Sequence, residues 1–251
     1  MKIVAIHQPN FMPWLGYFHK IRHADTFVVL DHVQFPKTGA GTWINRVKML
    51  IAGEARWVTV PLDRSFHGTR SIREMRMSED PAWVAKMLAT IRGSYLKAPF
   101  FSTIYPVVES ILGRRDEGLA EMNHQGILDL CNCCGLTLPE MPLSSQMDPQ
   151  GSSNDLLIDL IKKVGGTHYL CGAVAASATG YHEEDAFNRA GITVIHQDFK
   201  HPAYTHPAKN GFEKGLSIVD ALFHAGPQAT LEMLSAPPLA YASIGAVSRT
   251  L

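Results

Sequence analysis

An apolar run at residues 3–6, without alternation of apolar and polar side chains, is the feature that constrains the fold most. Such a run is typical of a strand that is buried on both faces of a parallel sheet. Because this strand begins almost at the first residue, we expect no secretory or transit peptide ahead of it. The run therefore favours an α/β fold in which helices cover both faces of the sheet.

Polar side chains follow two of the expected strands at the point where each strand ends. The first strand is followed by His7, Gln8 and Asn10. A second apolar and β-branched strand, at residues 26–30, is followed by Asp31 and Gln34. Ligands of open parallel sheets bind beyond the carboxyl ends of the strands, so these side chains are candidates for one site. Taken singly, His7 and Asp31 are equally compatible with structural roles in a loop.

A helix is expected between these two strands. Pro13 suits its first turn, and Trp14, Tyr17 and Phe18 recur at helical spacing. One aromatic face of the helix should therefore pack inward. Trp14 and Tyr17 lie near its start, close to the expected site, and are candidate substrate contacts.

A second strand, helix, strand unit is expected late in the chain, with strands at residues 167–171 and 192–197. Two such units predict a doubly wound, mainly parallel sheet. Cys171 and Gly172 come at the ligand-facing end of a strand, where a thiol is a candidate nucleophile and glycine allows close approach. His201 and Tyr204 follow the last strand as candidate substrate contacts. We expect the strand ends at Ile6, Leu30 and Cys171 to surround one pocket.

The segment at residues 37–46 is rich in glycine and predicts a loop that directly follows the second polar cluster. Lys37 and Arg46 are placed to meet an anionic group such as phosphate or carboxylate, and Asn45 to donate a hydrogen bond. Solvated surface charge is the alternative interpretation for both cations.

Residues 1–251 are expected to form a single α/β domain with a mostly helical insertion at about residues 80–135. Cys131, Cys133 and Cys134 fall in a helical pattern within it. Their spacing fits neither a disulfide framework nor a zinc site, which favours buried free thiols and no metal. Reduced cysteines favour a cytoplasmic protein.

Charge and hydropathy exclude two classes of partner. The chain has 23 lysines and arginines and 23 aspartates and glutamates, so no strong field attracts nucleic acid. No stretch reaches the 18 or so consecutive apolar residues of a membrane span, and membrane binding is not expected.

Several motifs together resemble the WbqC-like protein family. The longest is HQPNFMPWLGYFHKI at residues 7–21, and others are SYLKAPFF at 94–101, Ser144-Ser145, GGTHYLCG at 165–172, HPAY at 201–204 and LSIVDALFHAG at 216–226. The resemblance implies a bacterial protein of surface-polysaccharide assembly, such as O-antigen biosynthesis. It also implies a role in transferring glycine to an amino sugar.

The chain departs from the family pattern at two places near the expected site. His32 replaces a second acid after the strand, and Cys171 replaces a serine before Gly172. Both departures change a side chain that could contact substrate. They leave open an acceptor from natural-product or other small-molecule biosynthesis.

The leading hypothesis is an enzyme that forms an amide by acyl or aminoacyl transfer to an amino sugar or another small amine. His7 is its predicted acid/base and Asp31 the residue that orients it, with Arg46 holding an anionic group. Hydrogen bonds to the substrate are assigned to Gln8, Asn10, Gln34 and Asn45. Expected ligands are an amino sugar, an amino acid or an activated acyl donor. The sequence does not identify a cofactor and leaves open whether ATP is used, and a homodimer stays open.

Two alternatives come from other classes. The first strand and helix also resemble nucleotidyltransferase-like (HUP-like) enzymes, some of which use ATP to activate a carboxylate. Their HxGH-type ATP motif is absent, because Trp14-Leu15-Gly16-Tyr17 stands in its place. The other alternative is a binding module for a sugar nucleotide without catalytic activity, which turnover would distinguish.

Overall fold

The computed structural model describes residues 1–36, 42–172 and 184–236. Its centre is a four-stranded sheet in the order β2-β1-β5-β6, in which every neighbouring pair is parallel. The strands are β1 (Ile3–His7), β2 (Thr26–Val29), β5 (His168–Cys171) and β6 (Thr193–His196). The expected α/β fold with a mainly parallel sheet is thereby confirmed. The chain turns to one side of β1 to form β2 and later to the other side to form β5 and β6.

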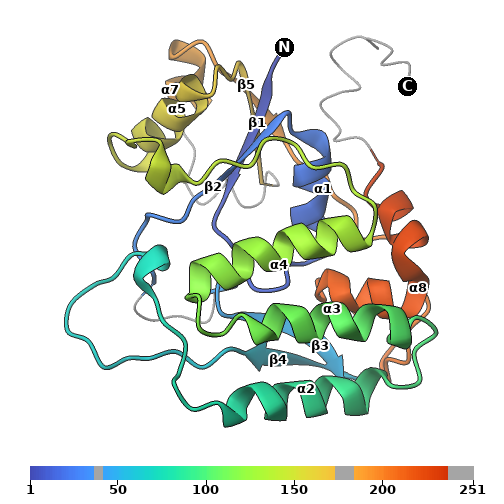
Figure 1. Ribbon diagram of the computed structural model, residues 1–251. Coiled ribbons are helices and arrows are strands. Elements are labelled where there is room, and N and C mark those ends of the chain that lie inside the picture. The colour runs from blue at the N-terminus through green and yellow to red at the C-terminus, as the bar shows by residue number, and fades with distance from the viewer. Residues whose placement is uncertain (37–41, 173–183, 237–251) are drawn as a thin grey trace.

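Helices cover both faces of this sheet (Figure 1). One face packs on α1 (Leu15–His23), and α4 and α8 contribute to the same core. The other face packs on α5 (Ser153–Lys163) and α7 (Glu184–Arg189). Because side chains alternate along a strand, Ala5 faces the first core and Ile6 the second. The inward aromatic face expected for the first helix is present, since Tyr17 and Phe18 are fully buried.

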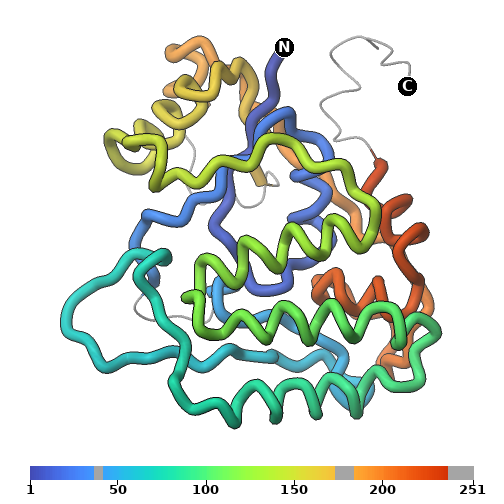
Figure 2. Tube along the Cα trace, in the orientation of Figure 1, coloured from blue at the N-terminus to red at the C-terminus, as the bar shows by residue number. Residues whose placement is uncertain are grey.

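A layer of helices, which we call the helical layer, lies beyond the carboxyl edge of the sheet, as the chain trace in Figure 2 shows. It contains η1 (Ile72–Glu74), α2 (Ala82–Tyr95), α3 (Phe101–Gly113) and α4 (Leu119–Cys133), and α8 (Ile218–Met233) packs beside them. A short turn, η2 (Ser144–Gln146), leads back toward the sheet. No helix among the described residues combines the length and apolar character that a membrane crossing requires.

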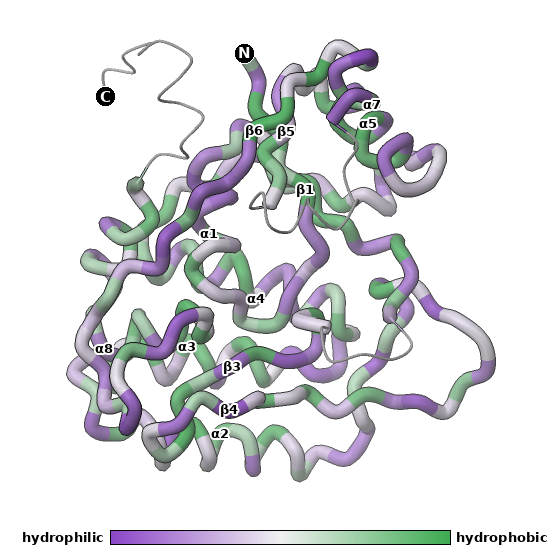
Figure 3. Tube along the Cα trace, turned by 180° about the vertical axis from the view of Figure 1, so that it is seen from behind, coloured by the Kyte–Doolittle hydropathy of each residue, from purple (hydrophilic) through white to green (hydrophobic). Residues whose placement is uncertain are grey.

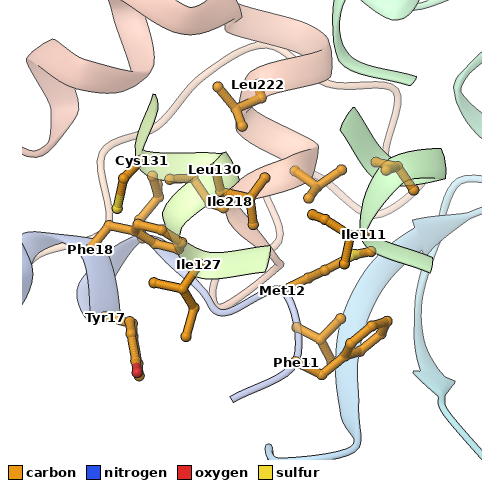
Figure 4. Close-up of a cluster of buried hydrophobic side chains, with 14 of the residues drawn as sticks. Phe11, Met12, Tyr17, Phe18, Ile111, Ile127, Leu130, Cys131, Ile218 and Leu222 are labelled. Atoms are coloured by element: carbon orange, nitrogen blue, oxygen red, sulfur yellow. The ribbon is translucent and has the colours of Figure 1, made fainter. Parts of the chain in front are cut away.

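The principal core joins α1, α4 and α8 around the loop after β1 (Figure 4). Phe11 and Met12 of that loop lie in it beside Ile127 and Cys131 of α4. Cys131 is fully buried and Cys134 nearly so, which confirms the expected buried thiols at these two positions, whereas Cys133 is only partly buried. Burial raises the pKa of Cys134 to about 11, so this thiol stays protonated at neutral pH.

A two-stranded antiparallel hairpin, β3 (Arg46–Ile51) and β4 (Glu54–Thr59), stands apart from the main sheet. Its turn residues Ala52 and Gly53 both have positive φ angles, 52° and 80°, as a tight two-residue hairpin requires. The alternating residues 57–60, closed by Pro61, predict a strand that overlaps β4, whereas β3 is not predicted because apolar and polar residues alternate only over residues 46–49. The hairpin brings Arg46 out of the expected loop and into a strand.

Candidate functional site

The carboxyl ends of all four sheet strands lie at one edge. The backbone N–H of Leu30 donates to the carbonyl of His7 at 2.8 Å, and that of Gln197 to the carbonyl of Cys171 at 3.3 Å. Ala5 pairs with Leu170, so His7 extends one residue beyond the level of Cys171. The strand ends at Ile6, Leu30 and Cys171 therefore share one edge, and the pocket predicted between them stays a prediction.

Cys171 forms a chain of contacts with a histidine and a carboxylate. Its pairing with His196 in the parallel register places the two side chains next to each other. The Sγ atom lies 3.2 Å from Nδ1 of His196, and Nε2 of that ring lies 2.5 Å from Oε1 of Glu184. The order thiol, imidazole, carboxylate is that of an activated cysteine nucleophile. The sequence pattern identifies the thiol but misses both partners.

Burial and a nearby cation act in opposite directions on this thiol. Cys171 is fully buried, and burial raises its pKa to about 11, against which the positive charge of Lys20 acts. The thiol is therefore protonated at neutral pH. Its S–H can donate a hydrogen bond to Nδ1 of His196 or to the carbonyl of Gly172 at 3.4 Å. Transfer of the proton to the imidazole produces the thiolate, which is the nucleophilic form.

Lys20 is a buried amine on α1 that the sequence pattern did not single out. Its side chain has no carboxylate partner among the described residues, and only 7% of the residue is exposed. Burial lowers the pKa of Lys20 to about 8. The same charge lowers the pKa values of both His7 and Cys171, so it acts on both candidate catalytic groups. Its place in the motif at residues 7–21 is the signal that could have identified it.

His7 is held between the aromatic rings of α1 and the segment that precedes it. Its ring meets Tyr17 edge-on at 4.8 Å between centroids and Trp14 at 5.9 Å. Nδ1 lies 3.1 Å from the carbonyl of Gln8, which can only accept, so Nδ1 carries the proton and Nε2 a lone pair. Burial, helped by the charge of Lys20, lowers the pKa of His7 to about 3. The ring is thus uncharged at neutral pH.

The predicted contact between Asp31 and His7 is not formed; the carboxylate of Asp31 binds two serines instead. Its carboxylate accepts hydrogen bonds from the hydroxyl of Ser144 at 2.9 Å and from the N–H and hydroxyl of Ser145 at 2.9 and 2.6 Å. These three bonds fix η2 against the end of β2. Asp31 is therefore an anchor in this geometry, and the predicted orienting role is corrected.

His32, the residue that departs from the family pattern, joins the same cluster. Its Nδ1 lies 2.6 Å from Oγ of Ser144, whose hydroxyl already donates to Asp31. The imidazole N–H is therefore the donor in the contact between His32 and Ser144. The substitution at residue 32 is accommodated by a hydrogen bond to a buried serine.

Three other predicted substrate contacts have partners within the protein. The amide of Asn45 is buried and donates to the carbonyl of Val60 at 3.0 Å, which fixes the hairpin. The hydroxyl of Tyr204 donates to Oδ2 of Asp220 at 2.7 Å. His201 packs edge-on against Phe199 at 5.1 Å. These contacts favour structural roles for Asn45 and Tyr204.

Asp220 is the centre of a buried network that explains the position of Tyr204. Its fully buried carboxylate also accepts from the hydroxyl of Tyr95 at 2.8 Å and contacts Nδ1 of His206 at 3.2 Å. The network ties α2 and α8 to the segment after β6. It stabilises the packing of the helical layer, and none of its hydrogen bonds involves Cys171, His196 or Glu184.

The remaining predicted residues take varied positions. Asn10 is buried in the loop after β1, and Gln34 is exposed and bridges to Ser71 through the backbone. Gly172 directly follows Cys171 at the edge, and Lys37 lies outside the described residues. Arg46 lies with Trp57 on the hairpin. Across residues 1–36, 42–172 and 184–236, no group of three or more metal-ligating side chains comes together.

Fold and site together define a parallel α/β protein with a cysteine, histidine and glutamate cluster at the carboxyl edge of its sheet. A model of the WbqC-like protein family matches residues 8–232, and the chain belongs to this family. It is similar to the uncharacterized protein Rv1507c of Mycobacterium tuberculosis (strain ATCC 25618 / H37Rv), with 27% identity over 230 residues, or 91% of this chain and 96% of that protein. No solved structure matches the chain significantly.

Proposed function

We propose that this protein forms an amide by acyl or aminoacyl transfer to a small amine, with Cys171 as the nucleophile that carries the acyl group. The contact of Cys171 with His196, itself held by Glu184, is the observation that supports this proposal best. Glu184 accepts from Nε2 of the imidazole, which leaves Nδ1 free to take the thiol proton. Cysteine and histidine arranged in this way are typical of acyl-transfer sites.

In the first step, Nδ1 of His196 takes the proton of Cys171, and the thiolate attacks the carbonyl carbon of an activated acyl donor. The carbon–sulfur bond forms, the bond to the leaving group breaks, and the imidazolium returns its proton to that group. Glu184 stabilises the imidazolium while it exists. The positive charge of Lys20 favours the thiolate over the thiol.

In the second step, the acceptor amine attacks the thioester carbonyl. An amide bond forms, the carbon–sulfur bond breaks, and the surplus proton of the amine is removed by a base. We assign this role to His7 because its Nε2 bears a lone pair; its lowered pKa keeps the ring uncharged and makes it a weak base, so it can hold the proton only briefly. His7 packs on the α1 side of the sheet and Cys171 on the side of α5 and α7, so this step requires the acyl group and the amine to meet at the strand ends themselves.

Burial of the thiol bears on the choice of acceptor. A fully buried Cys171 needs a local opening of the edge before an acyl donor can reach it. Once closed, the site excludes water and protects the thioester from hydrolysis. Transfer to an amine is then favoured over loss of the acyl group to water.

Family membership supports the finer assignment. We propose an amino sugar of surface-polysaccharide assembly as the acceptor and glycine as one candidate acyl group, which the family resemblance implies. Because His32 and Cys171 depart from the family pattern, the alternative acceptor is a small-molecule amine of another pathway.

A carboxylate-activating ligase of the nucleotidyltransferase-like (HUP-like) type is the second candidate. It is supported by the change of winding direction between β1 and β5, since such a point is where open parallel sheets bind nucleotides. ATP consumption with each amide formed would favour this candidate over a preactivated donor.

The experiment is intact-mass spectrometry of the protein after exposure to a set of small acyl thioesters, glycyl and acetyl among them. We expect one acyl mass on Cys171, no adduct in Cys171→Ser, and a much slower adduct in His196→Ala. Cys133→Ser is the matched control, since this thiol is half-buried in α4 and should not change the labelling. Labelling that survives Cys171→Ser would contradict the proposal.

A further inference from the structure

One face of the β3–β4 hairpin carries side chains that packing does not explain. Val47, Met49 and Val58 point into the core and are buried. Strand alternation sends Arg46 and Lys48 to the opposite face, where Trp57 is 40% exposed. Figure 3 shows this hairpin from behind, with β3 above β4. Trp57, Arg46 and Lys48 therefore share one outward face of the hairpin.

A row of three indoles leads from this face to His7. The ring centroids of Trp57 and Trp43 are 5.0 Å apart, and those of Trp43 and Trp14 are 4.9 Å apart. Trp14 in turn lies 5.9 Å from His7. Three of the four tryptophans of the chain thus form a continuous aromatic strip that ends at the candidate site.

Two cations lie over the outer end of this strip. The guanidinium carbon of Arg46 lies 4.4 Å from the centroid of Trp57, and Nζ of Lys48 lies 5.5 Å from it. Neither cation has a carboxylate partner among the residues that the structure describes, and Nε of Arg46 is buried without a hydrogen bond. Arg56 on the same hairpin is different, because it pairs with Glu54 at 2.7 Å. Among the cations of the hairpin, those without a carboxylate partner are therefore the two that lie over the aromatic strip.

We propose that this strip, made of Trp14, Trp43, Trp57, Arg46 and Lys48, is a subsite for a nucleoside diphosphate, the activating group of an amino-sugar acceptor. Indoles stack on a planar base and on sugar rings, and the two cations meet the diphosphate. A neutral sugar would need the indoles but would leave both cations and the Nε donor unused. The subsite specifies how the acceptor of the proposed acyl transfer is recognised, and the identity of that acceptor rests on the proposed function.

Isothermal titration calorimetry of the full chain with UDP, ADP and inorganic phosphate tests the subsite. We expect either nucleotide to bind more tightly than phosphate. Trp57→Ala should weaken nucleotide binding about tenfold, as loss of one stacked ring does, and Arg46→Gln by a similar factor or more. Arg56→Gln is the matched control and should leave the dissociation constant within about twofold. Circular dichroism checks that each variant is folded.

Three results would overturn the subsite: no heat of binding with either nucleotide, unchanged binding in both Trp57→Ala and Arg46→Gln, or equally tight binding of neutral glucosamine derivatives. Its failure is separable from that of acyl transfer. Cys171→Ser should still bind nucleotide, because the thiol takes no part in the strip. A chain that acylates Cys171 but binds no nucleotide refutes the subsite alone.

Discussion

Replacing Asp31 by alanine should destabilise the protein by about 3 kcal/mol. The carboxylate is 4% exposed and accepts three hydrogen bonds from Ser144 and Ser145. A hydrogen bond to a charged group contributes about 1.5–3 kcal/mol, but the three share one anchor and are not additive. Ser144 also keeps its contact with His32, which moderates the loss. For a chain of this length the melting temperature should fall by about 6–12 °C.

The assay is urea unfolding followed by circular dichroism, with calorimetry for the melting temperature. Asp31→Asn should lose about half as much, because one amide oxygen still accepts whereas the amide nitrogen cannot. Asp116→Ala is the control, since that carboxylate is 82% exposed and pairs with Arg115 at 3.5 Å; its effect should stay below about 0.5 kcal/mol. A double-mutant cycle of Asp31→Ala with Ser145→Ala should show coupling. Equal stability of Asp31→Ala and the unchanged protein would refute the anchor.

Two further predictions concern a buried cation and a glycine. The pKa of Lys20 falls from 10.5 to about 8 in the folded protein, so the unfolded chain binds more protons between these values and the free energy of unfolding should rise with pH there. Lys20→Met should lack this rise, which amounts to roughly 3 kcal/mol between the two pKa values. Free energies of unfolding that change with pH in parallel for the two proteins would contradict the lowered pKa of Lys20. Gly226→Ala should destabilise by about 2 kcal/mol or more, because its φ is 85° and an added Cβ would lie 2.5 Å from the ring of Phe100. Gly93 lies in α2, and a Cβ added there would meet no neighbouring atom within 4 Å, so Gly93→Ala should instead stabilise by about 0.5–1 kcal/mol. Urea unfolding measures both glycine variants.

Local sequence patterns predicted the main sheet because each of its strands contains a short apolar run. The switch to polar residues after residues 6 and 30 predicted the shared edge, and the parallel pairing of β1, β2 and β5 places it there. The helical spacing of Tyr17 and Phe18 predicted the buried face of α1. In each case the signal lies within one element and needs no knowledge of distant partners.

Side-chain partners were less predictable, because they depend on pairing between distant segments. Asp31 meets Ser144 113 residues along the chain, so its neighbour could not be inferred from the strand end. Cys171 meets His196 through the register of β5 and β6, which a one-residue shift would abolish. Lys20 looks like an ordinary surface lysine of a helix until α1 is packed on the sheet. Strand β3 was missed because its alternation is short and follows glycines.

The most direct test of acyl transfer through Cys171 is a single-turnover chase. Protein carrying a labelled acyl group on its thiol is mixed with an amino-sugar acceptor, and the loss of thioester is followed beside the gain of amide. Acyl transfer predicts that both proceed at one rate with one amide per thioester, and that Cys171→Ser forms neither. Amide formation at an unchanged rate in Cys171→Ser, or thioester that hydrolyses without passing its acyl group to the amine, would contradict it.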